Sequence, residues 1–235
     1  AIKDNEYVLE IGTGSGLLSM MANDAGAHKV VTCEVSQPIA EAAKRIIEIN
    51  GYKDRIKVIN KKSTELIVGK DLDKKADLII SEILSSEFVG EGVQSSISDA
   101  NQRLIKESGK MIPESGEIKI ALLESSQEIE KEMFVQKVNG YDLSEFNNIM
   151  GSKYDLQYLG RKIKTTFLSK EKVPFRFNFY SKEIINKQEI ILNIEVCKSG
   201  ICLGLITWMR VKLYEDIYFE NNPDAKFTSG WTNPI

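Results

Sequence analysis

A short apolar strand runs directly into three closely spaced glycines near the start of the chain. Residues 7–11 suit a buried strand, and Gly12, Gly14 and Gly16 follow before a segment whose apolar residues have helical spacing. Glycines between a strand and a helix let the backbone approach a ligand closely, because no Cβ atom intervenes. A dinucleotide site would need its third glycine at position 17, which is a leucine. We therefore predict an α/β sheet with a ligand site of another kind at this loop.

Strand-like and helix-like segments alternate in the first half of the chain, and the pattern changes after Pro113. Further strands are predicted at residues 30–34, 56–59 and 77–81, and helices at 17–25, 36–50 and 93–105, the last ending near Gly109. β-branched and aromatic runs follow at 118–123, 175–180, 190–196 and 203–213. This order predicts a mostly parallel sheet over residues 1–112 and an all-β part over 113–235. A mixed, partly helical insert at 125–160 interrupts the second part.

Composition and charge exclude several classes of protein. The 235 residues are 42% apolar, enough for a proper core, but no apolar stretch is long enough to span a membrane. A net charge of −3 argues against nucleic acid as the main partner and allows a cationic protein substrate. The single histidine, His28, excludes histidine-based triads and multi-histidine metal sites, so we expect no metal. Three cysteines without framework spacing indicate a reducing compartment, cytosolic or nuclear, and Cys197 and Cys202 are expected to pack as strand residues.

The first two predicted strands each have a glutamate at the carboxyl end, near the glycine loop. Glu34 ends the second strand, where an acidic side chain can accept both hydroxyls of a ribose. Glu10 completes the pattern E-x-G-x-G-x-G, which resembles motif I of S-adenosylmethionine-dependent methyltransferases. The resemblance implies S-adenosylmethionine as cofactor and S-adenosylhomocysteine as its product. The segment 62–65 after the third strand would either contact the adenine or cap a helix.

Three more carboxylates occupy the segment that follows the fourth predicted strand. Glu82 and Glu91 are nine residues apart, so a hairpin-like loop can bring them together. Two carboxylates held close raise each other's pKa unless a cation joins them, and a guanidinium pairs well with carboxylates. Taken alone, the stretch is equally consistent with a solvated acidic loop. Glu87, in the middle, is assigned a supporting or solvated role.

The pattern S-E-x8-E-G at 81–92 resembles the double-E loop of protein arginine N-methyltransferases. The run E-F-V-G-E-G within it is similar to the monomethylating (type III) branch of that family. Residues 140–144 resemble the start of the family's dimerisation arm, and 200–204 resemble a strand of its β-barrel. Residues 229–231 stand where the family has a Thr-His-Trp loop. The resemblance covers nearly the whole chain and implies a Rossmann-like sheet followed by a β-barrel, with an inserted arm at about 136–160.

The resemblance also assigns roles to individual residues. Glu82 and Glu91 would hold the arginine of a substrate protein, with Leu84 and Trp231 beside it. The cofactor would contact Glu10, Gly12, Gly14, Gly16, Glu34, Val35, Ser63 and Thr64. The implied reaction moves a methyl group to a guanidinium nitrogen of arginine in basic proteins. The implied partner is a second copy of the chain or an internal pseudo-repeat.

Two other functions stay open, and the chain departs from the family in three places. The alternatives are a small-molecule methyltransferase and a cofactor-binding scaffold without turnover. Only seven residues precede Val8, where the family has further helices, and four follow Trp231, so we expect a chain that is incomplete at both ends. Gly230 replaces the family's histidine, which favours monomethylation or symmetric dimethylation.

Overall fold

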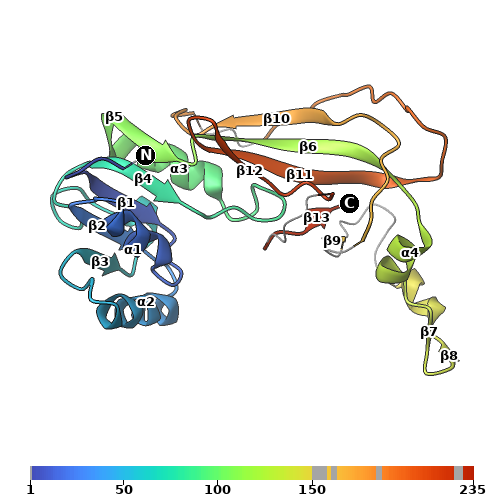
Figure 1. The fold of residues 1–235 in the computed structure, drawn as a ribbon, viewed down its shortest axis with the longest axis horizontal. Helices are drawn as coiled ribbons and strands as arrows, with labels where there is room; N and C mark the ends of the chain where they lie inside the picture. Colours follow the sequence, from blue (N-terminus) through green and yellow to red (C-terminus); the bar gives the residue numbers. More distant parts are fainter. Residues whose placement is uncertain (1, 150–157, 160–162, 184–186, 225–229) are drawn as a thin grey trace.

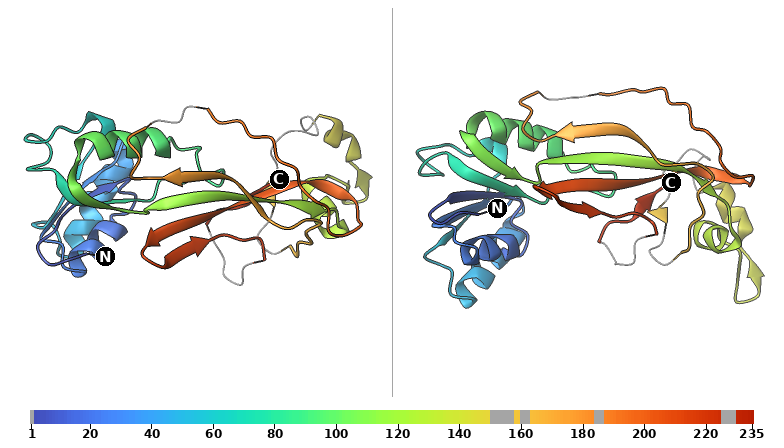
Figure 2. Two further views of the ribbon diagram at one scale, coloured as in Figure 1. Left: turned by 90° about the horizontal axis from the view of Figure 1, so that it is seen from above. Right: turned by 45° about the horizontal axis from the view of Figure 1, so that its top comes forward.

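The chain forms two parts, a parallel α/β part and an elongated antiparallel part (Figure 1). The structure is a computed structural model and describes residues 2–149, 158–159, 163–183, 187–224 and 230–235. In Figures 1 and 2 the antiparallel strands extend to one side of the parallel sheet, so the molecule is long rather than round. Among the described residues, no helix combines the length and apolar character that crossing a membrane would require.

Five parallel strands make up the first sheet, in the order β3-β2-β1-β4-β5. The strands are β1 (Tyr7–Ile11), β2 (Lys29–Cys33), β3 (Ile56–Ile59), β4 (Ala76–Ser81) and β5 (Ile105–Ile112). The helical segments are α1 (Leu17–Asp24), α2 (Gln37–Ile49), the 3-10 turn η1 (Ser63–Glu65) and α3 (Val93–Arg103). The strand order reverses between β1 and β4, and open α/β sheets bind ligands beyond the carboxyl ends of the strands at such a point.

Alternate residues of the central strand β1 face opposite layers of helices. Val8 packs with Ala22 of α1 and Ile47 of α2, whereas Leu9 packs in the core that contains Ile97 of α3. Because side chains alternate along a strand, these contacts place α1 and α2 on one face and α3 on the other. All five residues of β1 are buried, as expected for a strand that is covered on both faces.

A four-stranded antiparallel sheet, in the order β10-β6-β11-β12, forms the second part. Its strands are β6 (Ser115–Glu124), β10 (Lys172–Asn178), β11 (Cys202–Tyr214) and β12 (Ile217–Glu220). Smaller elements are α4 (Gln127–Met133), β7 (Lys137–Val138), β8 (Tyr141–Asp142), the 3-10 turn η2 (Ser144–Asn148), β9 (Tyr158–Leu159) and β13 (Asn233–Pro234). The predicted combination of a Rossmann-like sheet with an all-β part is therefore correct. The described strands do not form a closed barrel. The β-barrel therefore stays a prediction.

One hydrophobic core joins the two parts. Phe177 of β10 and Met209 of β11 belong to the same buried cluster as Leu9 and Ile79 of the parallel sheet. The chain crosses from β5 to β6 at Pro113, so the predicted boundary near 112 falls between the two sheets, although the core continues across it.

The predicted arm at 136–160 is described only in part. The hairpin β7–β8 and the turn η2 project from the end of the antiparallel sheet that lies away from the parallel part (Figure 1). Residues 150–157 and 160–162 lie outside the described residues, as does Ser229 of the segment 229–231.

Three local predictions were wrong. The helix predicted over 93–105 ends at Arg103, and the residues from Ile105 form the edge strand β5 because they pair with β4. The segment 190–196 is not a strand: apart from a bridge between Val196 and Ser169 it has no described strand partner, and Ile191 is 97% exposed. Cys197 and Cys202 are exposed rather than packed. Residues with high strand propensity form a strand only where a neighbouring strand can pair with them.

Candidate functional site

A cavity of about 620 Å³ lies beyond the carboxyl ends of β1, β2 and β4. This cavity, called the main cavity below, brings together eight residues predicted for the site: Gly12, Gly14, Glu34, Val35, Ser63, Thr64, Glu82 and Glu91. Its size falls within the range of roughly 300–1,000 Å³ that is usual for small-molecule sites. Segments from four places in the sequence therefore meet where the strand order reverses.

The glycine loop has the backbone conformation that only glycine adopts easily. Gly12, Gly14 and Gly16 have φ values of 89°, 51° and 83°, in the left-handed region. A Cβ atom on Gly12 would lie 2.7 Å from Cγ2 of Ile83, so this loop touches the segment that carries Glu82. Gly16 does not line the main cavity, and a Cβ there would lie 2.9 Å from Cδ1 of Ile47. Gly16 therefore allows close packing against α2, and its predicted contact with the cofactor stays a prediction.

Glu34 ties the glycine loop to the end of β2. Its carboxylate accepts hydrogen bonds from the backbone N–H groups of Gly14 (3.3 Å) and Ser36 (2.9 Å). A carboxylate has about four acceptor sites, so it can still accept hydroxyl groups from a ligand in the cavity. Asn60, which sequence reasoning missed, fixes the backbone after β2: its side-chain amide donates to the carbonyl oxygens of Glu34 (2.8 Å) and Val35 (3.1 Å).

Glu10 lies beneath the main cavity rather than in its lining. The side chain is 1% exposed, and its carboxylate accepts a hydrogen bond from the hydroxyl of Ser19 in α1. Burial raises the pKa of Glu10 to about 7, although the hydrogen bonds from Ser19 and Thr32 act in the opposite direction. Glu10 therefore links β1 to α1, and its predicted contact with the cofactor stays a prediction.

The turn η1 supplies Ser63 and Thr64 to the main cavity. The alternative that these residues cap a helix is not supported, because no side chain caps η1. Arg103, at the end of α3, donates to the carbonyl oxygens of Leu66 (2.8 Å) and Thr64 (3.0 Å). Its guanidinium also pairs with Asp99 at 2.6 Å, one helical turn earlier. Sequence reasoning missed Arg103, and the only signal was this pair of opposite charges four residues apart.

Glu82 and Glu91 both line the main cavity. Burial in the cavity wall raises the pKa of Glu82, a hydrogen bond from the backbone of Leu84 lowers it, and repulsion by Glu91 raises it further. The two carboxylates therefore interact, as the sequence predicted for the ends of one loop. Burial and the charge of Glu91 thus make the charged form of Glu82 less favourable, and a cation bound between the two carboxylates would offset both effects.

A buried aromatic ring holds the middle of the loop between these glutamates. Phe88 is almost fully buried and stacks on Phe177 of β10, with ring centroids 4.7 Å apart. Its backbone N–H donates to the carbonyl of Ser85 (2.9 Å), and the N–H of Gly90 donates to the hydroxyl of the same serine (2.8 Å). Gly116 of β6 leaves room for the ring, since a Cβ there would lie 2.2 Å from Cζ of Phe88. The ends of the loop are thereby directed to the main cavity.

Trp231 and Leu84 lie in a neighbouring cavity of about 370 Å³, and Glu91 lines both cavities. The indole N–H of Trp231 donates to the carbonyl of Leu84 (2.7 Å). The ring also meets Phe219 of β12 edge-on, with centroids 5.1 Å apart. The predicted substrate-side residues are therefore in contact with each other and adjacent to Glu91.

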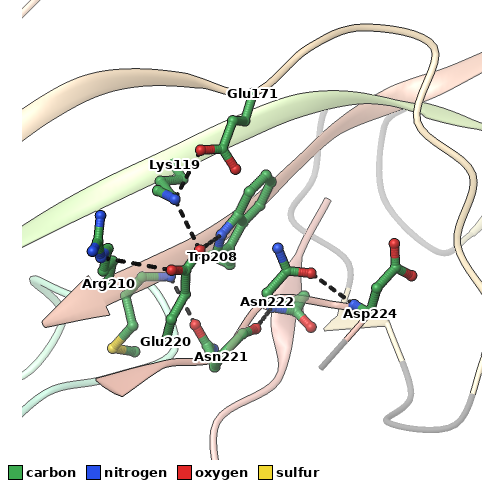
Figure 3. Close-up of polar contacts among 10 residues, drawn as sticks. Lys119, Glu171, Trp208, Arg210, Glu220, Asn221, Asn222 and Asp224 are labelled. Carbon is green, nitrogen blue, oxygen red and sulfur yellow. Dashed lines mark hydrogen bonds and ion pairs between the residues drawn. The ribbon is translucent and has the colours of Figure 1, made fainter. Parts of the chain in front are cut away.

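Figure 3 shows polar contacts around Glu220 and Asn221 on the antiparallel sheet. Glu220, next to Phe219, accepts hydrogen bonds from Lys119 and from the indole of Trp208, both at 2.9 Å. Asn221 follows: its side-chain oxygen accepts from the backbone N–H of Met209 (2.7 Å), and its carbonyl accepts from the side chain of Asn233 (2.9 Å). Sequence reasoning missed these residues, because their contacts depend on strand pairing.

Within the described ranges, no group of three or more histidine, cysteine, aspartate or glutamate side chains is arranged to hold a metal ion. His28 is exposed and directly precedes β2.

The first part of the chain matches a known methyltransferase family. The family model described as ribosomal protein L11 methyltransferase (PrmA) matches residues 1–148. Solved structures resemble both parts. The structure titled "Trypanosoma brucei PRMT1 enzyme-prozyme heterotetrameric complex with AdoHcy" has a TM-score of 0.76 at 22% identity and covers 98% of this chain and 72% of that one. Protein arginine methyltransferase 10 of Arabidopsis thaliana has a TM-score of 0.76 at 20% identity, covering 98% and 73%. At these identities the likeness shows the fold.

Curated relatives are similar in sequence as well. Protein arginine N-methyltransferase 7 of Aedes aegypti is 34% identical over 219 residues, covering 88% of this chain and 32% of that protein. The Mus musculus protein of the same name is 47% identical over 120 residues, covering 50% and 17%. The arginine N(omega)-methyltransferase of Streptomyces achromogenes subsp. streptozoticus is 32% identical over 230 residues, covering 95% and 62%. The chain thus spans less than two thirds of each of these proteins. Residues 1–148 belong to the methyltransferase family that the PrmA model describes, and the chain as a whole belongs to the protein arginine N-methyltransferase family.

Proposed function

We propose that this chain transfers a methyl group from S-adenosylmethionine to a guanidinium nitrogen of arginine residues in proteins. The observation that carries the proposal is that Glu82 and Glu91 line the same cavity as the glycine loop and Glu34. A pair of carboxylates suited to a guanidinium thus faces the place where such folds bind a nucleoside. The names of the curated relatives support the same activity.

The main cavity fits S-adenosylmethionine, which would supply an electrophilic methyl group and leave S-adenosylhomocysteine. A Cβ atom on Gly14 would meet nothing within 4 Å, so the backbone of this glycine is open to a ligand. Glu34 has acceptor sites for the ribose hydroxyls. Ser63 and Thr64 line the same cavity and would contact the adenine. The backbone of the glycine loop would hold the remaining part of the cofactor. Glu10 would act indirectly, by holding α1 against β1.

Orientation of the substrate nitrogen is the main task of the two glutamates. Methyl transfer requires the attacking nitrogen in line with the methyl group, and fixing such a geometry removes much of the barrier. Glu82 and Glu91 would bind two edges of the guanidinium, which concentrates its positive charge away from the attacking nitrogen. As the nitrogen–carbon bond forms, that nitrogen loses a proton, which a carboxylate of the pair can accept. Trp231 would pack beside the substrate from the neighbouring cavity.

Free arginine is a second candidate substrate. The Streptomyces relative, which matches 95% of this chain, is named an arginine N(omega)-methyltransferase, without reference to proteins. The same carboxylate pair would hold the guanidinium of free arginine. The resemblance of 87–92 to the type III branch, together with Gly230, supports monomethylarginine as the product.

Radiolabel transfer separates these possibilities. The chain is incubated with methyl-labelled S-adenosylmethionine and either arginine-rich peptides or free arginine, and the products are identified by mass spectrometry. We expect label in the peptides as monomethylarginine. Label only in free arginine would assign the enzyme to the small-molecule class. Calorimetric binding of S-adenosylhomocysteine and peptide without any transfer would instead favour the scaffold.

The exposed arm supports a proposal about assembly. Tyr141 of the hairpin and Ile149 after η2 are 73% and 78% exposed, and Val138 and Phe146 are also exposed. Apolar surface of this kind marks a protein interface. We propose that the arm contacts a second copy of this module, either in another chain or within a longer protein. Light scattering at micromolar concentration should give the mass of a dimer, and Tyr141→Asp should shift it to that of a monomer. A monomer mass for the unmodified chain would remove contact with another chain and leave only contact within a longer protein.

Cytoplasm and nucleus remain the proposed location. Localisation of a fluorescently tagged full-length protein would test it, and a secreted protein would contradict it.

A further inference from the structure

A third cavity, of about 540 Å³, lies on the antiparallel part. It is formed around the segment 164–170, which runs along the last residues of β6: the N–H of Leu168 donates to the carbonyl of Leu122, and the carbonyl of Thr166 accepts from the N–H of Glu124. β6 starts beside the parallel sheet and ends far from it (Figure 1). The residues of this cavity line neither the main cavity nor the one beside Trp231. The methylation site therefore does not use it.

Three lysines, Lys164, Lys170 and Lys198, line this third cavity, which is called the lysine cavity below. None of them forms an ion pair with another residue in the described part of the chain. The chain as a whole has a net charge of −3, so such a group of unpaired lysines is a local excess of positive charge.

The carboxylate in this lining and the one that follows Lys170 in the sequence both have other partners. Asp224 is the one acidic residue of the lining, and it accepts a hydrogen bond from the hydroxyl of Thr165 at 2.5 Å. Glu171 follows Lys170 directly, but its carboxylate pairs with Lys119 at 2.9 Å (Figure 3). Lys119 is 6% exposed and bonds Glu220 as well, so it retains Glu171 firmly. The lining consequently has an excess of two positive charges.

We infer that the lysine cavity binds a phosphoryl group. A phosphoryl group carries a charge of about −1.5 to −2 at neutral pH, which matches the excess, whereas a single carboxylate neutralises only half of it. Lysine ammonium groups bind phosphate as point charges, and the hydroxyl of Thr166 in the lining adds a donor. Phe167 gives the cavity a rigid wall, because its ring stacks on Trp208 at 5.6 Å. The phosphoryl group can come from free phosphate or from a phosphorylated protein segment.

Two cysteines allow a direct test in the unmodified chain. Cys197 lines the lysine cavity, whereas Cys202 lies outside it, and both are exposed. The rate of alkylation by iodoacetamide is followed at each cysteine by peptide mass spectrometry, at constant ionic strength. We expect inorganic phosphate to slow the reaction at Cys197 in a saturable manner and to leave Cys202 unchanged. Equal slowing at both cysteines, or the same effect from potassium chloride, would overturn the inference.

Variants and ligands sharpen this test. Lys164→Gln, Lys170→Gln and Lys198→Gln should each weaken protection by phosphate about tenfold, because each removes one charged contact. Lys172→Gln, an exposed lysine of β10 outside the lining, is the matched control and should retain protection. A phosphoserine peptide that protects better than phosphate would assign a phosphorylated protein as the source, and equal protection would assign free phosphate. Equal protection by the same peptide with glutamate instead of phosphoserine would overturn the phosphoryl assignment. If the lysine cavity and the proposed methylation site are independent, these variants should leave methyl transfer unchanged. The failure of the phosphoryl inference and the failure of the proposed function can therefore be told apart.

Discussion

At the scale of single residues, the carboxylate of Glu82 carries the proposed chemistry. Its position in the cavity wall and the nearby charge of Glu91 both favour a bound cation. Glu82→Gln preserves the shape and removes the charge. We expect a loss of roughly 3–5 kcal/mol of transition-state stabilisation, a decrease of about two to four orders of magnitude in kcat/KM for an arginine peptide. Glu107→Gln is the control, since Glu107 is an exposed glutamate of β5 that lines neither this cavity nor the one beside Trp231. Retention of most of the rate by Glu82→Gln would disprove its role.

The raised pKa of Glu82 predicts the acid limb of the pH profile. Burial, and then the charge of Glu91, shift protonation of Glu82 to a higher pH than for an ordinary glutamate. Since the neutral form cannot pair with a guanidinium, kcat/KM should decline with falling pH earlier than an unperturbed carboxylate would allow. Glu91→Gln removes the repulsion and should lower the pKa of Glu82, which an NMR titration of its carboxyl carbon measures. An unchanged or higher value in this variant would contradict the coupling.

Burial of Glu10 links stability to pH with a defined sign. Its pKa is about 7 in the folded chain against 4.5 for an exposed glutamate, so the folded state holds the proton more tightly. Between these two values the unfolded chain loses the proton first, and the free energy of unfolding should fall as pH rises, by about 3 kcal/mol in total. Glu10→Gln removes this titration and can still accept the hydrogen bond from Ser19. Urea unfolding at pH 5 and pH 8 should therefore show a smaller decrease for the variant, and an identical decrease would refute the assignment.

At the scale of structural elements, the loop from Glu82 to Glu91 depends on one aromatic anchor. Phe88 is buried against Phe177 and above Gly116, so Phe88→Ala leaves a cavity between the loop and the antiparallel sheet. Such a replacement typically costs about 3–5 kcal/mol of stability. We also expect a higher KM for the peptide, because the loop ends are no longer held. Val89→Ala, at the exposed neighbour, should change neither stability nor KM by much. Chemical denaturation and steady-state kinetics measure both effects, and a Phe88→Ala variant with an unchanged KM would show that the loop is held elsewhere.

At the scale of the whole molecule, the shared core predicts that the two parts unfold together. The same buried cluster contains residues of both sheets and of the loop between them. Both tryptophans, Trp208 and Trp231, lie in the antiparallel part, whereas the proposed cofactor site lies in the parallel part. Addition of S-adenosylhomocysteine should therefore raise the Tm detected by tryptophan fluorescence, because a ligand stabilises the whole cooperative unit. Two separate calorimetric transitions, with only one of them shifted, would show that the parts are independent.

Local features of the chain could be predicted from the sequence with good accuracy. The strand at 7–11 and the strand at 56–59 have their predicted bounds, and the glycines at 12, 14 and 16 have the expected backbone conformation. The sequence also determined the family resemblance, because the patterns around Glu10 and Glu82 are short and contiguous. Such features depend on neighbouring residues, whose propensities and spacing are visible in one dimension.

Only the tertiary structure decided which residues meet and which are buried. It brings Ser63, Glu82 and Glu91 into one cavity, places Trp231 beside them, and moves Glu10 out of the lining. It also makes Ile105, predicted as the end of a helix, the start of a strand, and it leaves Ile191, predicted within a strand, exposed. Burial and proximity depend on which strands pair and on which faces are covered, and these are properties of the folded chain rather than of any segment.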